Sequence, residues 1–592
     1  MTNDTHFKVT GEYDASAIKV RKSKSHELGV RKLVNSVRFA YETKADVISL
    51  CLYKTPDGQP VCIITLDEYY KIGTVFSFEI SGIKLDNLLY CYKINDSICV
   101  DTYASGLYSY NENGNTGYFG LLKKDKYNWE DDKTPGILPE DLIIYKLHPK
   151  GFTRNRFSKV KHKGLFAGIA EKIPYMKELG INAVELMPSY EIIDDTHSNY
   201  WGYTDGFYFS PRIEYSVEKQ SNRDYTVEFK NMVKALHRAG IEVYIELFFK
   251  QKTHGSVIDD CVRFWKEEYH IDGVHLMCDE RVRYVLAEDP FIKDLKLFYV
   301  NWYEDCNSDN LFEYNDGFLE KARKLIKGDE EQLQSFLYHM RRNPAHASNV
   351  NYVANNNGFT LADVYMYDRK HNEANGENNR DGIDYNLSWN CGVEGQCRKR
   401  KVNDLRNRLM KNAMTFLMLA QGVPLIYAGD EFGNSQDGNN NAYCQDNDTG
   451  WVDWSRLQKN HKFFEYVKKL IEFRKNHKIL HLRQEPYLMD YKYFGIPDLS
   501  YHGVKAWYPD MEHYSRQAGI LWCGKYADEE QDVYMAFNMH WEPHTLALPV
   551  IKDRKWVWAF STADDAGMDI KGERDIIVDA RTVVVLVNEK NS

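Results

Sequence analysis

The chain has 592 residues, which is too many for one hydrophobic core and predicts two to four domains. Its hydrophobic content of 43% and charged content of 27% are typical of a globular protein and exclude a disordered one. The formal net charge of −10 disfavours nucleic acid or an anionic membrane as a partner.

The chain contains no recognisable leader or membrane segment. Residues Met1–His6 lack a basic stretch followed by an apolar one, and no apolar run approaches the roughly 20 residues that span a bilayer. Eleven cysteines are scattered without paired spacing, and Cys391 and Cys397 do not form a metal-ligand pattern. We therefore expect a cytoplasmic protein with free thiols, no cofactor and no metal site.

Residues 1–125 are predicted to form a β-sandwich. The runs at 36–41 and 47–53 are short and rich in β-formers, and turn signals such as Pro56-Asp57-Gly58 separate such runs.

A helix, a glycine and an apolar strand recur between residues 126 and 485. Apolar residues at helical spacing over 169–179 precede Gly180 and an apolar run at 181–186. The same order returns with a helix through 229–236, Gly240 and an apolar run from 241. Further strand candidates lie at 273–277, 295–300 and 423–429.

This repetition predicts a parallel sheet with crossover helices. Its extent favours a (β/α)8 barrel, a TIM barrel of the α/β class, with an open sheet as the alternative. A helix over 461–475 is expected to close the barrel, and residues 486–592 read as a second, C-terminal β-sandwich that ends in an apolar run at 576–587.

Several long, unusual runs identify a family resemblance. They lie at 142–148 (LIIYKLH), 151–153, 199–203 (NYWGY), 370–382, 388–395, 429–433 and 438–447. Together they resemble glycoside hydrolase family 13, in its isoamylase and bacterial glycogen-debranching branch, over nearly the whole chain. The resemblance implies that the N-terminal sandwich is similar to a carbohydrate-binding module.

The resemblance also implies catalysis by three carboxylates, at positions where this chain has none. Retaining cleavage of a glucosidic bond needs a carboxylate nucleophile and a carboxylic acid. By alignment with the family motifs, Met277 takes the place of the nucleophile, Val300 that of the acid (Asn301 if the register slips by one), and Asn357 that of the third carboxylate. A thioether cannot form the glycosyl ester, and Met277 reads more simply as a packing residue.

Neighbouring positions of the family motifs are changed as well. On the third predicted strand, Glu246 replaces the family aspartate, and Lys250 and Gln251 replace its Asn-His pair. Acids such as Asp279, Glu246 or Glu304 remain an alternative source of catalysis. Asp279 lies two residues beyond Met277, about 6–7 Å further along the strand, and a smaller displacement is enough to disrupt attack geometry.

Groups suited to binding a sugar remain. Tyr203 matches the family tyrosine that stacks on the sugar, with a core aromatic as the alternative interpretation. Hydrogen bonds around it are expected from His148, Glu185, Asp205, Gln251, His275 and Asn356. The block 372–380 matches a family loop beside the substrate, and it also reads as a loop held by its own Asn and Asp side chains.

Three hypotheses follow. The leading one is a catalytically silent relative that binds α-glucan such as glycogen, starch or branched maltodextrin, either alone or as the regulatory partner of an active debranching enzyme. The second is an active α-1,6-glucosidase that uses displaced carboxylates. The third is an interaction protein without sugar binding.

Overall fold

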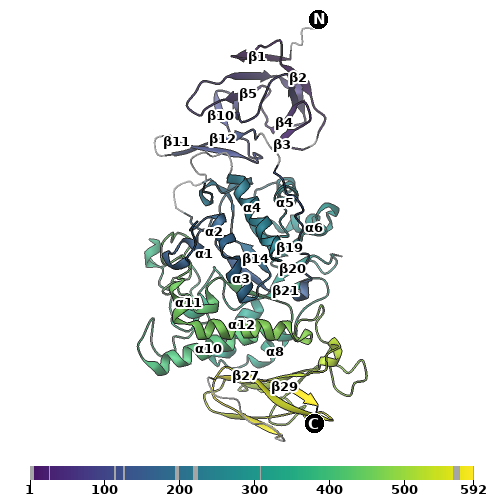
Figure 1. Ribbon diagram of the computed structural model, residues 1–592, viewed down its shortest axis with the longest axis vertical. Coiled ribbons are helices and arrows are strands. Elements are labelled where there is room, and N and C mark those ends of the chain that lie inside the picture. The colour runs from purple at the N-terminus through teal and green to yellow at the C-terminus, as the bar shows by residue number, and fades with distance from the viewer. Residues whose placement is uncertain are drawn as a thin grey trace.

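The computed structural model of the chain describes residues 6–25, 27–112, 115–123, 127–193, 199–217, 225–306, 308–563 and 574–590. The molecule is elongated, with the N-terminal strands at one end, a helix-rich body in the middle and the C-terminal strands at the other end (Figure 1).

The N-terminal region consists of two antiparallel sheets. One has the order β1-β6-β5-β9-β12-β11 with β10 paired to β9, and the other has the order β2-β8-β4-β3 with β7 paired to β8. The strands are β1 (Phe7–Gly11), β2 (Lys19–Lys22), β3 (Gly29–Lys32), β4 (Val37–Glu42), β5 (Ile48–Tyr53), β6 (Cys62–Leu66), β7 (Lys71–Ile72), β8 (Val75–Ser81), β9 (Leu89–Ile94), β10 (Ser97–Cys99), β11 (Leu107–Glu112) and β12 (Asn115–Leu121).

The central region is a closed parallel barrel, as predicted. Its strands are, in order around the barrel, β13 (Ile144–Leu147), β14 (Ala183–Leu186), β17 (Glu242–Phe248), β18 (Gly273–Met277), β19 (Lys296–Tyr299), β20 (Leu311–Tyr314), β21 (Ser348–Asn351) and β22 (Val423–Tyr427). Because β22 also pairs with β13, the sheet has no edge, which excludes the open-sheet alternative. A short hairpin of β15 (Tyr190–Ile192) and β16 (Gly206–Pro211) lies between β14 and β17.

Helices surround this barrel. They are α1 (Gly151–Arg154), α2 (Phe166–Glu171), α3 (Ile173–Leu179), α4 (Tyr225–Arg238), α5 (Gly255–Tyr269), α6 (Glu280–Glu288), α7 (Asp316–Lys327), α8 (Leu333–Arg341), α9 (Leu361–Val364), α10 (Arg400–Leu419), α11 (Ser455–Lys459) and α12 (His461–Lys475). The helix expected over 169–179 is two helices, because Pro174 at the start of α3 cannot continue the hydrogen bonds of α2. Gly180, at φ +97°, ends α3 as predicted.

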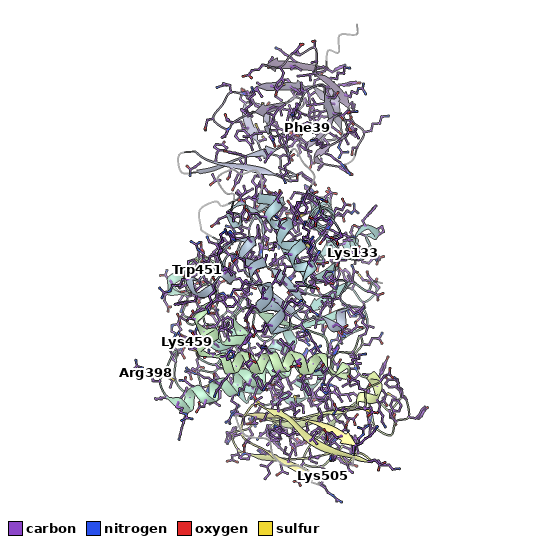
Figure 2. The ribbon with its side chains drawn as sticks, viewed as in Figure 1. Phe39, Lys133, Arg398, Trp451, Lys459 and Lys505 are labelled. Atoms are coloured by element: carbon purple, nitrogen blue, oxygen red, sulfur yellow. The ribbon has the colours of Figure 1, made fainter. Side chains whose placement is uncertain are left out.

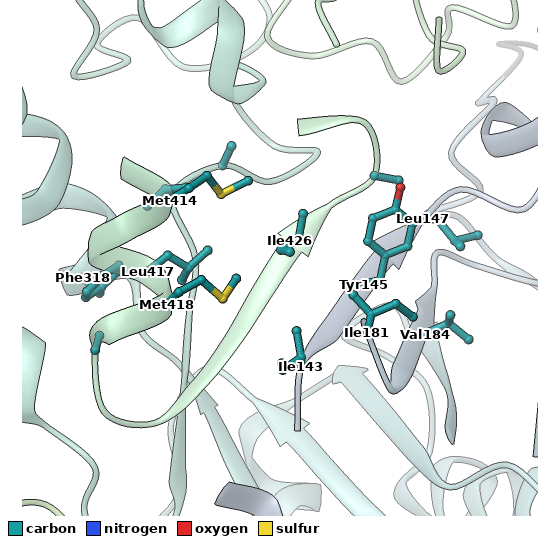
Figure 3. Close-up of a cluster of buried hydrophobic side chains, with 14 of the residues drawn as sticks. Ile143, Tyr145, Leu147, Ile181, Val184, Phe318, Met414, Leu417, Met418 and Ile426 are labelled. Atoms are coloured by element: carbon teal, nitrogen blue, oxygen red, sulfur yellow. The ribbon is translucent and has the colours of Figure 1, made fainter. Parts of the chain in front are cut away.

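Alternation along the barrel strands separates two cores. Residues such as Ile144, Tyr244 and Phe298 belong to a core inside the barrel. Ile426 belongs to the core outside it, where Figure 3 shows Met414 and Met418 of α10 on the side of the helix that faces the strand. A lone polar residue at an inward position is therefore enclosed by the barrel.

At the end of the barrel where the strands begin, a buried histidine lies between two carboxylates. His237 Nδ1 lies 3.2 Å from the carboxylate of Asp132, and its Nε2 lies 2.9 Å from Oδ2 of Asp272. Burial disfavours the imidazolium, but the hydrogen bonds and charges of the two aspartates outweigh it and raise the pKa of His237.

The C-terminal region has a five-stranded antiparallel sheet, β23-β24-β25-β29-β27, and the pair β26-β28. The strands are β23 (Leu499–His502), β24 (Gln517–Trp522), β25 (Val533–Asn538), β26 (His544–Ala547), β27 (Arg554–Ser561), β28 (Asp575–Val578) and β29 (Thr582–Lys590). The run expected at 576–587 is two strands, because the chain turns before β29 with Arg581 at φ 55°.

The sheets match the predicted flanking β-regions, while the boundaries at 125/126 and 485/486 stay a prediction. Within the described ranges, no helix is long and apolar enough to cross a membrane. All eleven cysteines have free thiols in the structure.

Candidate functional site

A polar cluster occupies the inside of the barrel. Lys146 of β13 lies opposite Glu185 of β14, and Glu246 of β17 lies opposite His275 of β18, by strand register. Tyr314, the last residue of β20, completes the cluster. The two glutamates have no exposed surface and Lys146 is only 2% exposed. Lys146, Glu185 and His275 are each the one charged or ionisable residue facing inward from a largely apolar strand, and Glu246 shares β17 with Glu242, so their polar ends must be satisfied inside the barrel.

The members of this central cluster contact one another closely, although Oε1 of Glu246 has an ion-pair contact and no hydrogen bond of standard geometry among the described residues. Lys146 Nζ lies 2.5 Å from Oε1 of Glu246 and 3.6 Å from Oε1 of Glu185. His275 Nδ1 lies 3.0 Å from Oε1 of Glu185 and 3.6 Å from Oε1 of Glu246. The Tyr314 hydroxyl donates to Glu185 at 2.5–2.6 Å, and its ring stacks on His275 with centroids 4.3 Å apart.

The cluster also balances its charge. Burial opposes ionisation of Glu246, but the charges of Lys146 and His275 outweigh it and lower the pKa of that carboxyl. In return, the two glutamates raise the pKa of Lys146 and of His275 against the effect of burial. Donor atoms of Glu185, Glu246 and His275 lie within 4.8 Å of one another, a set that could hold a cation. In this arrangement the Lys146 ammonium supplies the positive charge.

Tyr203 connects this cluster to the carboxyl-terminal end of the barrel. Its hydroxyl donates a short hydrogen bond to Oε2 of Glu246 and accepts one from Nδ2 of Asn356 at 3.3 Å. The ring is half-buried and packs edge-on against Trp201 and Phe248, with centroids 6.2 and 6.3 Å away. Burial and the adjacent Glu246 raise the pKa of Tyr203 well above its ordinary value, so the hydroxyl stays a donor.

The three positions assigned to catalytic carboxylates lie at the same end of the barrel. Met277 is the last residue of β18, two residues beyond His275 and so on the same face, and it is half-buried rather than fully packed in the core. Val300 directly follows β19 and is 61% exposed. Asn357 is exposed. Asn301, the alternative to Val300, is held by Arg283 through its carbonyl at 2.5 Å and its side chain at 2.6 Å.

Not all of the predicted binding residues join this site. Glu185, His275, Asn356 and Tyr203 do, as described above. His148 makes no hydrogen bond or ion pair with the central cluster in the described structure and lies against Tyr200: Nε2 is 2.9 Å from the Tyr200 carbonyl oxygen, and Nδ1 accepts backbone N–H groups of the following turn at 3.0 and 3.2 Å. Burial lowers the pKa of His148 to about 3.

Two further predicted residues lie apart from the cluster. Asp205 pairs with Lys250 at 2.5 Å and accepts a hydrogen bond from Tyr208 at 3.2 Å. Gln251 is exposed, three residues beyond the end of β17.

The displaced acids have structural partners or lie on the surface. Asp279 caps α6 by accepting the Arg281 N–H at 3.0 Å, and the Arg281 guanidinium holds both of its oxygens at 2.7 and 2.8 Å. These hydrogen bonds lower the pKa of Asp279 to about 2. Glu304 is exposed in the loop after β19.

Sequence reasoning missed part of the site. Lys146 and Tyr314 were not proposed, although a lysine within Ile143-Ile144-Tyr145-Lys146-Leu147 is the same signal that Glu185 gives in its own strand. Aromatic residues around Tyr203 were also missed; its cluster contains Tyr200, Trp201, Tyr427, Tyr443 and Trp451, the last of which is labelled in Figure 2.

The Asn-rich loop at 372–380 is held by its own side chains. Asn372 accepts the backbone N–H of Asn440 at 3.0 Å and donates to the Asn440 side chain at 2.8 Å. Asn375 donates to Asp381 at 2.7 Å, and Asn379 accepts the Asn372 N–H at 2.8 Å. These hydrogen bonds agree with the interpretation of 372–380 as a loop held together by Asn and Asp side chains.

Known proteins resemble the chain in sequence. The chain is 29% identical to chloroplastic isoamylase 1 of Oryza sativa subsp. japonica, over 92% of this chain and 82% of that protein. It is 32% identical to the glycogen operon protein GlgX homolog of Mycobacterium bovis, over 60% of this chain and 61% of that protein. No protein-family model matches the chain.

Solved structures share the fold. Apo pullulanase from Paenibacillus barengoltzii superposes with a TM-score of 0.73 at 19% identity, covering 95% of this chain and 94% of that one. The same enzyme in complex with maltohexaose and α-cyclodextrin gives a TM-score of 0.72 at 19% identity, covering 96% of each chain.

Proposed function

Since the chain is a homologue of the isoamylases and GlgX debranching proteins of glycoside hydrolase family 13, we propose that it binds α-glucan without cleaving it. Its place is then in glycogen or starch metabolism, where it acts as a regulatory partner of an active debranching enzyme. The central cluster carries this proposal, because it commits the two enclosed carboxylates to partners inside the protein.

Loss of the nucleophile and the acid supports the absence of catalysis. Met277 and Val300 carry no group that can attack a sugar carbon or protonate a glycosidic oxygen. Asn357 keeps the shape of aspartate without its charge. Residues that act as one catalytic unit lose most of the rate when one is removed, about 10⁴ to 10⁶ in a protease case.

The remaining carboxylates are poorly suited to replace them. Glu246 pairs with Lys146 and accepts a hydrogen bond from Tyr203, while Glu185 accepts hydrogen bonds from Tyr314 and His275. To act as a nucleophile, either glutamate would have to break these contacts and leave Lys146 or His275 without its carboxylate inside the barrel. Asp279 is bound to Arg281 and to the start of α6, which disfavours the hydrolase alternative.

Binding needs none of the lost groups. The Tyr203 ring is fixed by its hydroxyl and flanked by other aromatic residues, which is the arrangement that stacks on a sugar face. Asn356, beside that hydroxyl, has an amide that can bond sugar hydroxyls. The P. barengoltzii pullulanase, which shares the fold, was crystallised with maltohexaose.

Turnover and retention must be measured on the same protein. Purified chain is incubated with glycogen, pullulan and a branched dextrin, reducing ends are followed for a day, and the protein is then run on a glucan affinity gel. We expect retention without turnover, and loss of retention in Tyr203→Ala.

Tyr493→Ala, which removes a 92% exposed tyrosine after the barrel, is the matched control and should be retained like the wild type. Turnover that disappears in Glu246→Gln or Asp279→Asn would overturn the proposal in favour of a hydrolase. Absence of both turnover and retention would favour an interaction protein without sugar binding.

A further inference from the structure

A cavity of about 750 Å³ lies where the N-terminal sheets meet the outer surface of the barrel. Arg38 of β4 and Tyr90 of β9 line it on one side, and Lys230 of α4 and Phe264 of α5 line it on the other. Lys123, beyond the last N-terminal strand, contributes to the wall between them. This volume lies in the range of small-molecule sites, about 300–1,000 Å³.

Lys123 differs from the other basic side chains of the lining, which form ion pairs with acids in the described structure. Six basic and five acidic side chains line the cavity, and several form pairs: Glu27 holds Arg31 and Arg38, and Glu268 holds Lys230. Lys123 takes part in no ion pair among the described residues. Its Nζ donates instead to two neutral oxygens at 2.9 Å, the Ser105 carbonyl and the Thr226 hydroxyl.

A second cationic side chain has an unused donor. Arg38 is 7% exposed, and its Nε is buried without a hydrogen-bond partner in the described structure, although the guanidinium also contacts Glu27. A buried N–H group without an acceptor is costly, but this one has almost no accessible surface, so a ligand reaches it only if neighbouring side chains move.

The remaining walls supply aromatic faces. Tyr127, Trp129 and Phe291 line the cavity, and Tyr103 stacks on Phe209 there with ring centroids 4.4 Å apart. Aromatic faces pack well against the C–H face of a sugar ring.

We propose that this cavity binds a small sugar phosphate, with its phosphate at Lys123 and its ring against the aromatic wall. The Lys123 ammonium, whose hydrogen bonds in the described structure go to neutral oxygens, matches the charge of the phosphate. The cavity lies outside the barrel, so the inference does not rest on the proposed glucan binding.

Binding is linked to protons at Lys123. Burial and the nearby Lys230 lower the pKa of Lys123 to about 7, so the ammonium is partly neutral at neutral pH. A bound phosphate favours the charged form, so the protein takes up a proton when the ligand binds. Affinity should therefore fall as the pH rises above 7.

Calorimetry on the full chain tests the proposal with glucose 1-phosphate, glucose 6-phosphate, glucose and inorganic phosphate. We expect binding of one of the sugar phosphates, weaker binding of inorganic phosphate and none of glucose. Titrations in two buffers of different ionisation enthalpy should show proton uptake, which is measured on the wild type and does not depend on any variant folding.

Lys123→Met keeps the side-chain length and should weaken binding at least tenfold, whereas Lys133→Met, at an exposed lysine further along the chain (Figure 2), should not. Tyr203→Ala should retain the sugar phosphate, so a failure of glucan binding is distinguished from a failure here. No binding at millimolar ligand, binding without proton uptake, or equal binding by Lys123→Met would overturn the proposal.

Discussion

Removing Lys146 should expose how much the barrel depends on its internal charge balance. In Lys146→Met, two buried glutamates face His275 alone. Breaking a buried pair by removing one partner costs about 3–5 kcal/mol. Methionine approximately conserves volume, and Glu246 keeps its hydrogen bond from Tyr203, so we expect the lower end of this range, a loss of about 3 kcal/mol in the free energy of unfolding.

Urea unfolding followed by circular dichroism measures this loss. Lys146→Met/Glu246→Gln leaves Glu185 with His275, again balanced, and should be more stable than Lys146→Met. Glu246 has a lowered pKa in the wild type, so its contribution is present above its unfolded pKa and is lost as the pH falls through the folded value. The cost of Lys146→Met should therefore shrink on acidification. A cost below about 1 kcal/mol at neutral pH, or a double variant no more stable than the single one, would refute this reasoning.

Three other predictions concern other parts of the barrel. His237 has a raised pKa, so its stabilising contribution is complete below the unfolded pKa of about 6.5 and is lost as the pH rises through the folded pKa. The difference in the free energy of unfolding between wild type and His237→Gln should therefore narrow with rising pH. A constant difference would contradict this. Gly180→Ala places a side chain at φ +97°, with its Cβ 2.9 Å from Ile471, and should cost about 1–2 kcal/mol by urea titration, whereas no measurable cost would mean that the turn relaxes. Asp279→Asn retains a helix-capping side chain and should leave both the thermal midpoint and glucan retention nearly unchanged; a clearly lowered midpoint or a loss of retention would contradict this.

The fold could be predicted from sequence because its signal is periodic and local. Apolar strands after glycine-terminated helices indicated a barrel, and the helix over 461–475 was placed correctly. Errors arose where one residue overrides the pattern, as Pro174 does by dividing a helix.

The candidate site was harder to predict, because its contacts join five strands far apart in the chain. Glu185 and His275 were proposed for sugar binding, but the sequence does not show that they face Lys146 and Tyr314 instead of solvent. His148 shows the same limit, since its Nε2 contacts the carbonyl oxygen of Tyr200, which becomes its neighbour only on folding.

The hydrogen bond between Tyr203 and Glu246 links the carboxyl-terminal end of the barrel to the charged cluster in its interior. A ligand that turns the Tyr203 ring must break that bond and so changes the balance between Glu246 and Lys146, about which the surrounding strands are packed. A ligand that accepts the ring as it stands leaves this balance intact and orders nothing further in the protein. By reciprocity, substitutions at Lys146 should alter the affinity of a ligand that turns the Tyr203 ring and leave that of the other kind unchanged.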